Sequence, residues 1–263
     1  MSEEPVLLDA TREGLAVVTL NRPLLNNAFN PEVIEKLIEI AEELRGADGV
    51  RCIILEGAGE SFSAGDDLSW ARFEADYTRE DHLEDARACG HLLQLWRSMP
   101  KPTIALVHGT AVGIAVGLIA ACDIAVADRS ASFACPDVKR GMVPAVLAPF
   151  IVETLGDRAA RRFLLTGEQI GPDEALRLGL VHRLVEDRQG LAAESEALAN
   201  AIFDTAPGAV ALTKSVIDIV DREPIDAQLL GEMSKKLAEA LMGPEAREGF
   251  AATLQKRKPG WAQ

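Results

Sequence analysis

The chain has 263 residues, of which 48% are hydrophobic and 26% charged, as in a globular protein with room for one domain and an appendage. Its formal net charge of -14 at pH 7 argues against nucleic acid or an anionic membrane as the main partner. A small anionic ligand held by a local basic cluster is still compatible with this charge.

The first half of the chain alternates between apolar runs and helical patterns. In chain order we expect strands at 6–8 and 16–20, a helix at 31–45, a strand at 50–56, a short helix at 68–73, a helix at 83–98, a strand at 102–107, a helix ending at 121, and strands at 124–127 and 132–134. The polar residues 74–82 are expected to form a loop. Strands that alternate with helices favour parallel pairing, and therefore an α/β fold.

Helical patterns dominate from Pro144 onward. Glycines bracket a short helix at 172–178, the run 181–185 reads as a strand, and further helices are expected at 191–204, 208–220, 226–242 and 244–257. The change in pattern near residue 205 predicts a core domain at 1–204 and a helical segment at 205–263, which is an appendage and not an independent domain.

The cysteines and one uncharged segment bear on the location of the protein. No C-x-x-C pair occurs among Cys52, Cys89, Cys122 and Cys135, which favours reduced core thiols and a cytoplasmic location. The N-terminus lacks a signal-peptide pattern. Residues 103–122 carry no formal charge and match the length of a membrane span, but Pro102 and Gly109 break them into a strand and a helix. We expect no membrane segment.

Two glycine-bearing turns are the most informative feature of the chain. Residues 61–68 follow the strand at 50–56, and residues 108–117 follow the strand at 102–107. Each is expected to turn tightly from a strand into a helix, and the first N–H groups of a helix have no partner within it. Two such turns that face each other can hold one oxygen atom that gains negative charge.

Motifs for dinucleotide binding, for a serine nucleophile and for a metal site are not supported by the surrounding sequence. The pair Gly57 and Gly59 resembles part of a dinucleotide fingerprint, but Phe62 stands where the third glycine belongs, so an oxidoreductase remains a minor alternative. Neither Ser61 nor Ser63 sits in a G-x-S-x-G motif. The spacing of the histidines does not match that of metal ligands, so we expect no metal site. They are His82, His91, His108 and His182.

Taken in order, several short motifs resemble the crotonase (enoyl-CoA hydratase/isomerase) superfamily over nearly the whole chain. The resemblance implies a spiral of ββα units with a C-terminal helical segment that builds a homotrimer or hexamer. It also implies an acyl-CoA substrate and no separate cofactor, because coenzyme A is part of the substrate. The matching segments are 17–23, Asn27-Ala28, Gly65 to Leu68, Lys101 to Ala105, Cys122 to Ile124, Phe133 to Asp137, Leu165 to Gly167, Gly179 to Val181 and Lys256 to Pro259.

The resemblance also implies roles for particular residues. The backbone N–H groups of Asp66 and Ile114 match the two donors that hold the thioester oxygen in this family. The carbonyl of Ala64 matches the acceptor for the adenine amino group, and Lys256 matches a lysine that reaches the CoA phosphates of a neighbouring subunit. Asp67 and Leu68 complete the CoA-binding turn, with Asp67 as its structural cap. The alternative for Lys256 is a solvated basic tail.

The acid positions of the family are only partly occupied. Gly117 stands where a hydratase has its first catalytic glutamate, and Ala145 stands at a third acidic position. The second glutamate position holds Asp137, which is therefore the candidate acid–base residue, although it could instead only cap the turn after Pro136. The Asp66 side chain is expected to turn away from the developing negative charge, to pair with a cation, or to serve as a displaced acid–base group.

The function expected from these positions is acyl-CoA chemistry through an enolate held by two backbone N–H groups. A single carboxylate at Asp137 favours double-bond isomerisation or an atypical hydration. The alternatives are an acyl-CoA binding protein that has lost catalysis and a CoA-ester hydrolase. The segment 70–82, with Trp70, Phe73 and Tyr77, is expected to shape the acyl pocket.

Overall fold

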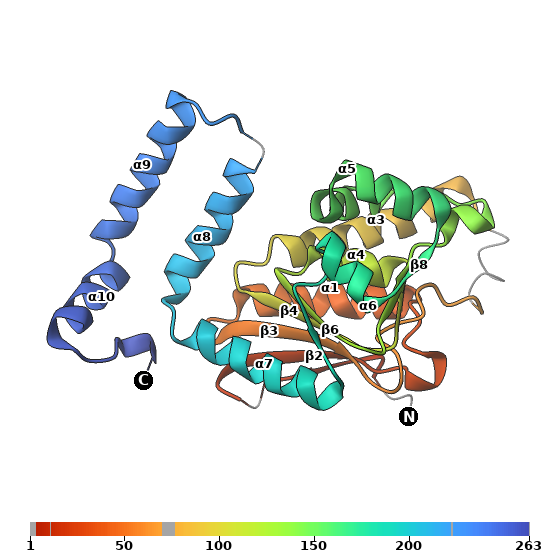
Figure 1. Cartoon of the computed structure of the whole chain (residues 1–263), viewed down its shortest axis with the longest axis horizontal. Coiled ribbons are helices and arrows are strands. Elements are labelled where there is room, and N and C mark those ends of the chain that lie inside the picture. The colour runs from red at the N-terminus through yellow and green to blue at the C-terminus, as the bar shows by residue number, and fades with distance from the viewer. Residues whose placement is uncertain (1–3, 11, 70–76, 222, 263) are drawn as a thin grey trace.

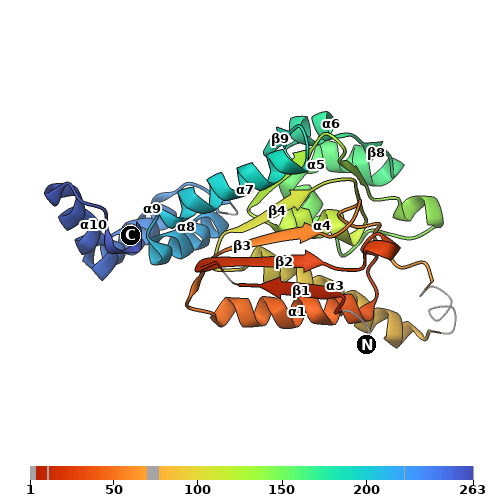
Figure 2. The same cartoon turned by 90° about the horizontal axis from the view of Figure 1, so that it is seen from below.

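A six-stranded sheet forms the centre of the computed structural model, which describes residues 4–10, 12–69, 77–221 and 223–262. Its strands are parallel to their neighbours except for the antiparallel pair β1 and β2, which confirms the expected α/β class. Figure 2 shows β1 to β4 side by side. In spatial order the strands are β1 (Val6–Asp9), β2 (Gly14–Leu20), β3 (Val50–Gly57), β4 (Thr103–Val107), β6 (Ile124–Asp128) and β9 (Arg183–Val185).

Helices cover both faces of this sheet, so its strands are apolar on both sides. Successive residues of β3 alternate between two cores: Ile53 and Leu55 belong to one, Cys52 and Ile54 to the other. The first core packs against α1 (Pro31–Gly46), α3 (Arg79–Arg97) and α4 (Ile114–Ala121), and the second against α7 (Arg188–Phe203) on the opposite side of the sheet (Figure 1).

A second, three-stranded sheet was only partly anticipated. It consists of β5 (Thr110–Val112), β7 (Ser132–Ala134) and β8 (Gln169–Ile170). The second glycine turn therefore does not pass directly from strand to helix, because β5 lies between β4 and α4. Single bridges join Ser63 to Ala111 and Asp66 to Phe29, and they tie the first glycine turn to β5 and to the start of α1. Strands of two or three residues leave too short a pattern to be recognised in sequence.

The N-terminus of α3 corrects the expected loop at 74–82. The helix begins at Arg79 because Thr78 and Asp81 form a capping box, in which each side chain accepts a hydrogen bond from the other residue's backbone N–H. The polar residues of this first turn remain exposed. Leu68 and Ser69 form a turn. The rest of the helix expected at 68–73, with Trp70 and Phe73, lies outside the described residues.

The C-terminal helices extend away from the sheet. Figures 1 and 2 both show α8 (Pro207–Val220), α9 (Ala227–Met242) and α10 (Pro244–Gln255) projecting from one end of the body. Lys214 anchors α8 to the body by donating to the carboxylate of Asp123 at 2.6 Å. The guanidinium of Arg51 donates to the carbonyls of Phe203 and Thr205 at 2.9 and 2.7 Å, and it holds the α7–α8 junction. In the described part of the chain, no helix combines the length and hydropathy needed to cross a bilayer.

Further elements complete the fold. They are α5 (Ala148–Thr166), which is broken at Gly156, α6 (Pro172–Leu178) and the 3-10 helices η1 (Pro23–Leu25), η2 (Asp137–Arg140) and η3 (Gly260–Ala262). The η2 helix follows β7, and its residues approach the first glycine turn. This short 3-10 helix carries Asp137 at its first position and Arg140 at its last.

Candidate active site

The first glycine turn presses its backbone against β5. Gly65 has a φ of +80°, and a Cβ atom there would lie 2.8 Å from the carbonyl oxygen of Val112, so only glycine fits. The Gly65 carbonyl accepts the N–H of Phe29 at 2.7 Å, which fixes the orientation of the next peptide. The N–H of that peptide, on Asp66, has no hydrogen-bond acceptor among the described residues.

The second turn presents a matching donor. Gly113, with a φ of +58°, precedes α4 and donates to the carbonyl of Ala134 at 2.9 Å. Its own carbonyl accepts the N–H groups of Val116 and Gly117. The N–H of Ile114, the first residue of the helix, is left without an acceptor in the part of the chain that the structure describes. The position of this free donor follows directly from the helix start.

Both residues line one small cavity of about 150 Å³. The cavity wall is otherwise mainly apolar and is formed by α3, α4, η2 and the segment before α5. Its lining residues are Asp66, Ala86, Cys89, Ile114, Asp137, Val143, Pro144, Ala145, Val146 and Leu147. Two free N–H donors on such a wall can stabilise an oxygen that becomes negatively charged.

Asp137 enters this cavity as the first residue of η2. Its Oδ2 atom is buried and has no hydrogen-bond partner among the described residues. No side-chain cap is found at the start of η2, so the alternative role of Asp137 as a turn cap gains no support. Leaving a buried polar atom unpaired is unfavourable, and such an atom is explained when a ligand supplies the partner. The unpartnered oxygen therefore marks Asp137 as a group available for proton transfer.

The Asp66 side chain pairs with a cation, one of the three arrangements expected from the sequence. Its Oδ2 lies 3.5 Å from Nη1 of Arg140, while 54% of the side-chain surface is exposed. The protein packed around the carboxyl and the negative charge of Asp137 raise the pKa of Asp66, and Arg140 partly opposes this. Arg140 carried no recognisable signal in the sequence, because its partner is 74 positions away.

Gly117 is buried, and the space next to it is filled. A Cβ atom at Gly117 would lie 3.0 Å from Cδ2 of Leu147 and 3.2 Å from Cδ1 of Leu93. Ala145 lines the cavity but contributes no acid. Asp66 and Asp137 are therefore the only carboxyl groups among the described residues of the cavity wall.

The chain resembles known proteins over its full length. The family model for enoyl-CoA hydratase/isomerase matches residues 10–263. The chain belongs to the enoyl-CoA hydratase/isomerase family. The short-chain-enoyl-CoA hydratase of Clostridium acetobutylicum is 33% identical over 94% of both chains, and the 1,2-epoxyphenylacetyl-CoA isomerase of Escherichia coli is 31% identical over 96% of this chain and 97% of its own. The crystal structure of an enoyl-CoA hydratase from Shewanella pealeana superposes with a TM-score of 0.94 at 34% identity, covering 98% of this chain and 96% of that one.

The residues of this enoyl-CoA hydratase/isomerase family member that were predicted to bind coenzyme A differ in their environments. Asp67 is buried, forms an ion pair with Arg22 at 2.9 Å and accepts hydrogen bonds from Ser69, as a structural cap would. Burial acts to raise the pKa of Asp67, but the hydrogen bonds from Ser69 and Arg22 outweigh it and lower the pKa. Leu68 is 66% exposed, and Ala64 donates its N–H to the carbonyl of Asn26 at 2.8 Å.

Asn27, which the sequence indicates only as part of the matching segment Asn27-Ala28, supports the first turn of the site. Its φ is +55°, and its side-chain amide donates to the carbonyls of Ala58 and Ser61, both at 2.8 Å. Asparagine tolerates the left-handed region better than most residues. The Asn26-Asn27 pair is the signal that could have indicated this turn.

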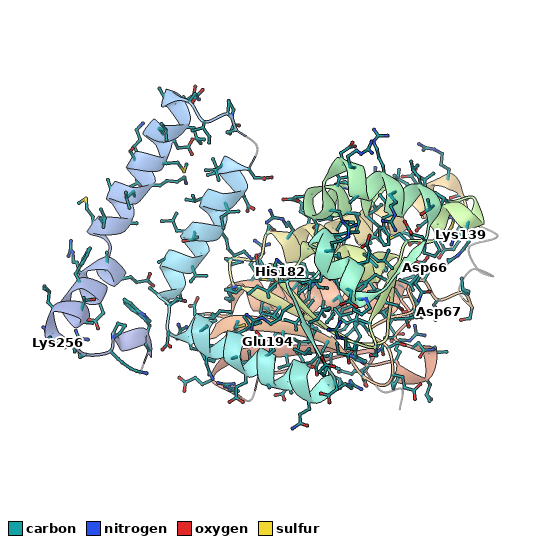
Figure 3. The ribbon with its side chains drawn as sticks, viewed as in Figure 1. Asp66, Asp67, Lys139, His182, Glu194 and Lys256 are labelled. Atoms are coloured by element: carbon teal, nitrogen blue, oxygen red, sulfur yellow. The ribbon has the colours of Figure 1, made fainter. Side chains whose placement is uncertain are left out.

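Lys256 lies far from the cavity of its own chain. Figure 3 places it at the end of the C-terminal helices, while Asp66, Asp67 and Lys139 gather at the opposite end of the molecule. The structure therefore does not bring Lys256 together with the other predicted site residues. Contact between Lys256 and a ligand in the same cavity would require a neighbouring copy of the chain.

Introducing a glutamate at position 117 is expected to destabilise this family member. Because Leu93 and Leu147 occupy the adjoining space, Gly117→Glu should lower the free energy of unfolding by about 1–3 kcal/mol through overpacking and should add no hydratase activity. Thermal melts and crotonyl-CoA hydration assays measure both effects. Gly117→Glu with Leu147→Ala, which makes room, is the matched comparison. A stable single variant that hydrates crotonyl-CoA would contradict this interpretation.

Proposed function

We propose that the protein isomerises the double bond of an acyl-CoA thioester through an enolate. The N–H groups of Asp66 and Ile114 hold the thioester oxygen, and Asp137 transfers the proton. The single observation that carries this proposal is the unpartnered, buried Oδ2 of Asp137 in the same cavity as two N–H groups without acceptors. A carboxylate oxygen without a hydrogen-bond partner can transfer a proton, and two N–H groups without acceptors in the same cavity can stabilise the oxyanion that forms.

The chemistry follows from these three groups. With a 3-enoyl-CoA, the Asp137 carboxylate removes a proton from C2, and the electron pair moves onto the thioester oxygen to give a dienolate. The two N–H donors stabilise that oxygen, and loss of one such donor typically costs about 3–4 kcal/mol of transition-state stabilisation. When the carbonyl re-forms, the double bond moves to C2–C3 and C4 takes up a proton. In the minimal scheme, Asp137 returns the proton that it removed.

Hydration demands more from the site than isomerisation. A hydratase must activate a water molecule and also deliver a proton to the double bond, which normally engages two acid–base groups. Gly117 and Ala145 provide none at the positions where the resemblance implies acids. Since relatives of this chain carry the names hydratase and isomerase, an atypical hydration that uses the carboxyl of Asp66 is the second candidate.

A substrate panel distinguishes these activities. Purified enzyme is incubated with 3-enoyl-CoA and 2-enoyl-CoA thioesters of several chain lengths, and the products are analysed by mass spectrometry and proton NMR. Isomerisation leaves the mass unchanged, hydration adds the mass of one water, and hydrolysis releases free coenzyme A. Micromolar binding with no turnover of any substrate would indicate a binding protein and would refute the proposal.

We propose further that coenzyme A binds at the carbonyl of Ala64 and beside Asp67 and Leu68, with Lys256 of a neighbouring subunit at its phosphates. The separation of Lys256 from the cavity of its own chain supports a homotrimer or hexamer (Figure 3). Large apolar side chains on α9 and α10 are exposed in the single chain, including Leu237, Met242, Phe250 and Leu254. The boundary near residue 205 then separates a catalytic core from an assembly segment. Sedimentation of the full chain tests the assembly.

The cysteines support a reducing, cytoplasmic location. All four are free, and Cys52 and Cys135 are buried. Burial, followed by the charge of a neighbouring aspartate, raises the pKa of each thiol to about 12, so these cysteines stay protonated. None of them is proposed as a nucleophile.

A further inference from the structure

We propose that the carboxyl of Asp66 is a second acid–base group of the cavity, and that it delivers the proton to C4 after Asp137 has removed a different proton from C2. This inference rests on the isomerase function proposed above and replaces its minimal scheme. It assigns a catalytic role to the side chain of a residue whose backbone N–H is already assigned to the thioester oxygen.

The position of the Asp66 carboxyl is the first support. Asp66 lines the same cavity as Asp137, although it comes from the other wall, at the end of the first glycine turn. Cys89 of α3 also lines this cavity. The charge of Asp137 acts on Asp66, and the charge of Asp66 acts on the thiol of Cys89. The carboxyl of Asp66 therefore lies close to the titratable groups of the cavity wall.

Arg140 is the second support. Its Nη1 lies 3.5 Å from Oδ2 of Asp66, and 54% of the Asp66 side chain is exposed. The carboxyl is thus paired with a cation and still accessible to a ligand. Arg140 and Asp137 are both residues of η2, so one short helix presents an acid to the cavity and also a cation to the opposing acid.

Electrostatics indicates which carboxyl starts with the proton. A carboxylate at Asp66 would repel the enolate oxygen bound to the N–H of the same residue, whereas a neutral carboxylic acid would not. The surrounding protein and the charge of Asp137 raise the pKa of Asp66, and Arg140 limits the rise. Burial raises the pKa of the thiols of Cys89 and Cys135 to about 12, so neither thiol is a competing base. The proton is assigned to Asp66, which lines the cavity beside Arg140, and the role of base to Asp137, whose buried Oδ2 has no partner among the described residues.

The proposed step balances. Asp137 carboxylate takes the proton from C2, and that C–H electron pair forms the C1–C2 double bond as the carbonyl pair moves to oxygen. When the carbonyl re-forms, the C1–C2 pair becomes the C2–C3 double bond, and the former C3–C4 pair forms a bond to the proton of Asp66. Asp137 ends protonated and Asp66 ends as a carboxylate. Exchange with water after product release restores both groups.

An isotope experiment separates the two schemes. A 3-enoyl-CoA with deuterium at C2 is converted in ordinary water, and NMR measures deuterium at C4 of the product. Delivery by Asp66 predicts none, because its proton comes from solvent. Deuterium carried from C2 to C4 by the wild-type enzyme in most turnovers would show that one carboxylate shuttles the proton, and it would overturn this inference while leaving the isomerase function intact. A wild-type enzyme that isomerises no enoyl-CoA would overturn both.

Asp66→Asn isolates the side chain, because the backbone N–H remains. We expect kcat to fall about 100-fold or more, with little change in the Kd for acyl-CoA, and the residual turnover should carry deuterium from C2 to C4. Asp173→Asn is the matched control, since Asp173 also pairs with an arginine, Arg129, but on the surface of α6. Asp66→Asn with a kcat within threefold of wild type would overturn the proposal.

Arg140→Gln tests the assignment through the pH profile of kcat/KM, which a purely structural role of Asp66 would leave unchanged. Arg140 lowers the pKa of Asp66, so its removal should raise that pKa and keep Asp66 protonated to higher pH. The basic limb of the kcat/KM profile should then shift to higher pH, and it should be absent in Asp66→Asn. A basic limb that stays in place in both variants would contradict the assignment of Asp66.

Discussion

Asp137→Asn is expected to lower kcat by about 100- to 10,000-fold, the usual contribution of a positioned acid–base group. The substitution keeps the size and polarity of the side chain but removes its ability to accept a proton from C2. Binding of acyl-CoA should change little, because the proposed contacts of the thioester oxygen come from the backbone of Asp66 and Ile114. Single-turnover kinetics and calorimetric titration separate these two quantities.

The fold should tolerate this change. Oδ2 of Asp137 has no partner among the described residues, so few native interactions depend on it, and the melting temperature of Asp137→Asn should be close to that of wild type. Asp67→Asn is the contrasting variant, since it breaks the ion pair with Arg22 and should lower the melting temperature. An Asp137→Asn enzyme that keeps full turnover of an accepted substrate would refute the role of Asp137.

Gly65→Ala is expected to reduce kcat/KM by about 100- to 1,000-fold, as loss of one oxyanion donor does. The added methyl group would lie 2.8 Å from the carbonyl oxygen of Val112, and backbone atoms cannot move aside as a side-chain end can. The turn must shift, and with it the N–H of Asp66. The geometry for the thioester oxygen is then lost even though both donors remain in the sequence.

Gly156→Ala controls for backbone strain alone. Gly156 has a φ of +74°, close to that of Gly65, but a Cβ atom there meets nothing within 4 Å, and the residue lies in the break of α5. Both variants should lose stability, because a positive φ is adopted without steric cost only by glycine. Only Gly65→Ala should lose activity. Equal kcat/KM values for Gly65→Ala and wild type would show that the first turn does not hold the reacting oxygen.

Much of the fold could be predicted because its signals are local. Asn30 caps α1 by accepting the N–H of Val33, and Pro31 follows at the first helical position, as the sequence indicates. The central strand β4 is buried along its whole length and mainly apolar because helices cover both faces of the sheet. Predicted boundaries fail where the signal is short, as in β5, or polar, as in the capping box of Thr78 and Asp81.

The candidate site also has features that local sequence encodes and features that depend on contacts between distant segments. The free N–H groups of Asp66 and Ile114 follow from turn and helix-start chemistry, which a few neighbouring residues encode. No local pattern could reveal that Arg140 approaches Asp66, since this ion pair exists only because η2 packs against a turn 74 positions earlier in the chain.

Local patterns were therefore enough for the α/β class and the two turns, and the resemblance of short motifs to a known family indicated Asp137 as the acid–base candidate. Packing between distant segments set what those residues can do. It left Oδ2 of Asp137 without a partner, filled the space beside Gly117 with Leu93 and Leu147, and placed Lys256 far from its own cavity. The physical reason is that charge pairing, burial and steric room depend on which segments meet in space, and those meetings are decided by the whole fold and not by neighbouring residues.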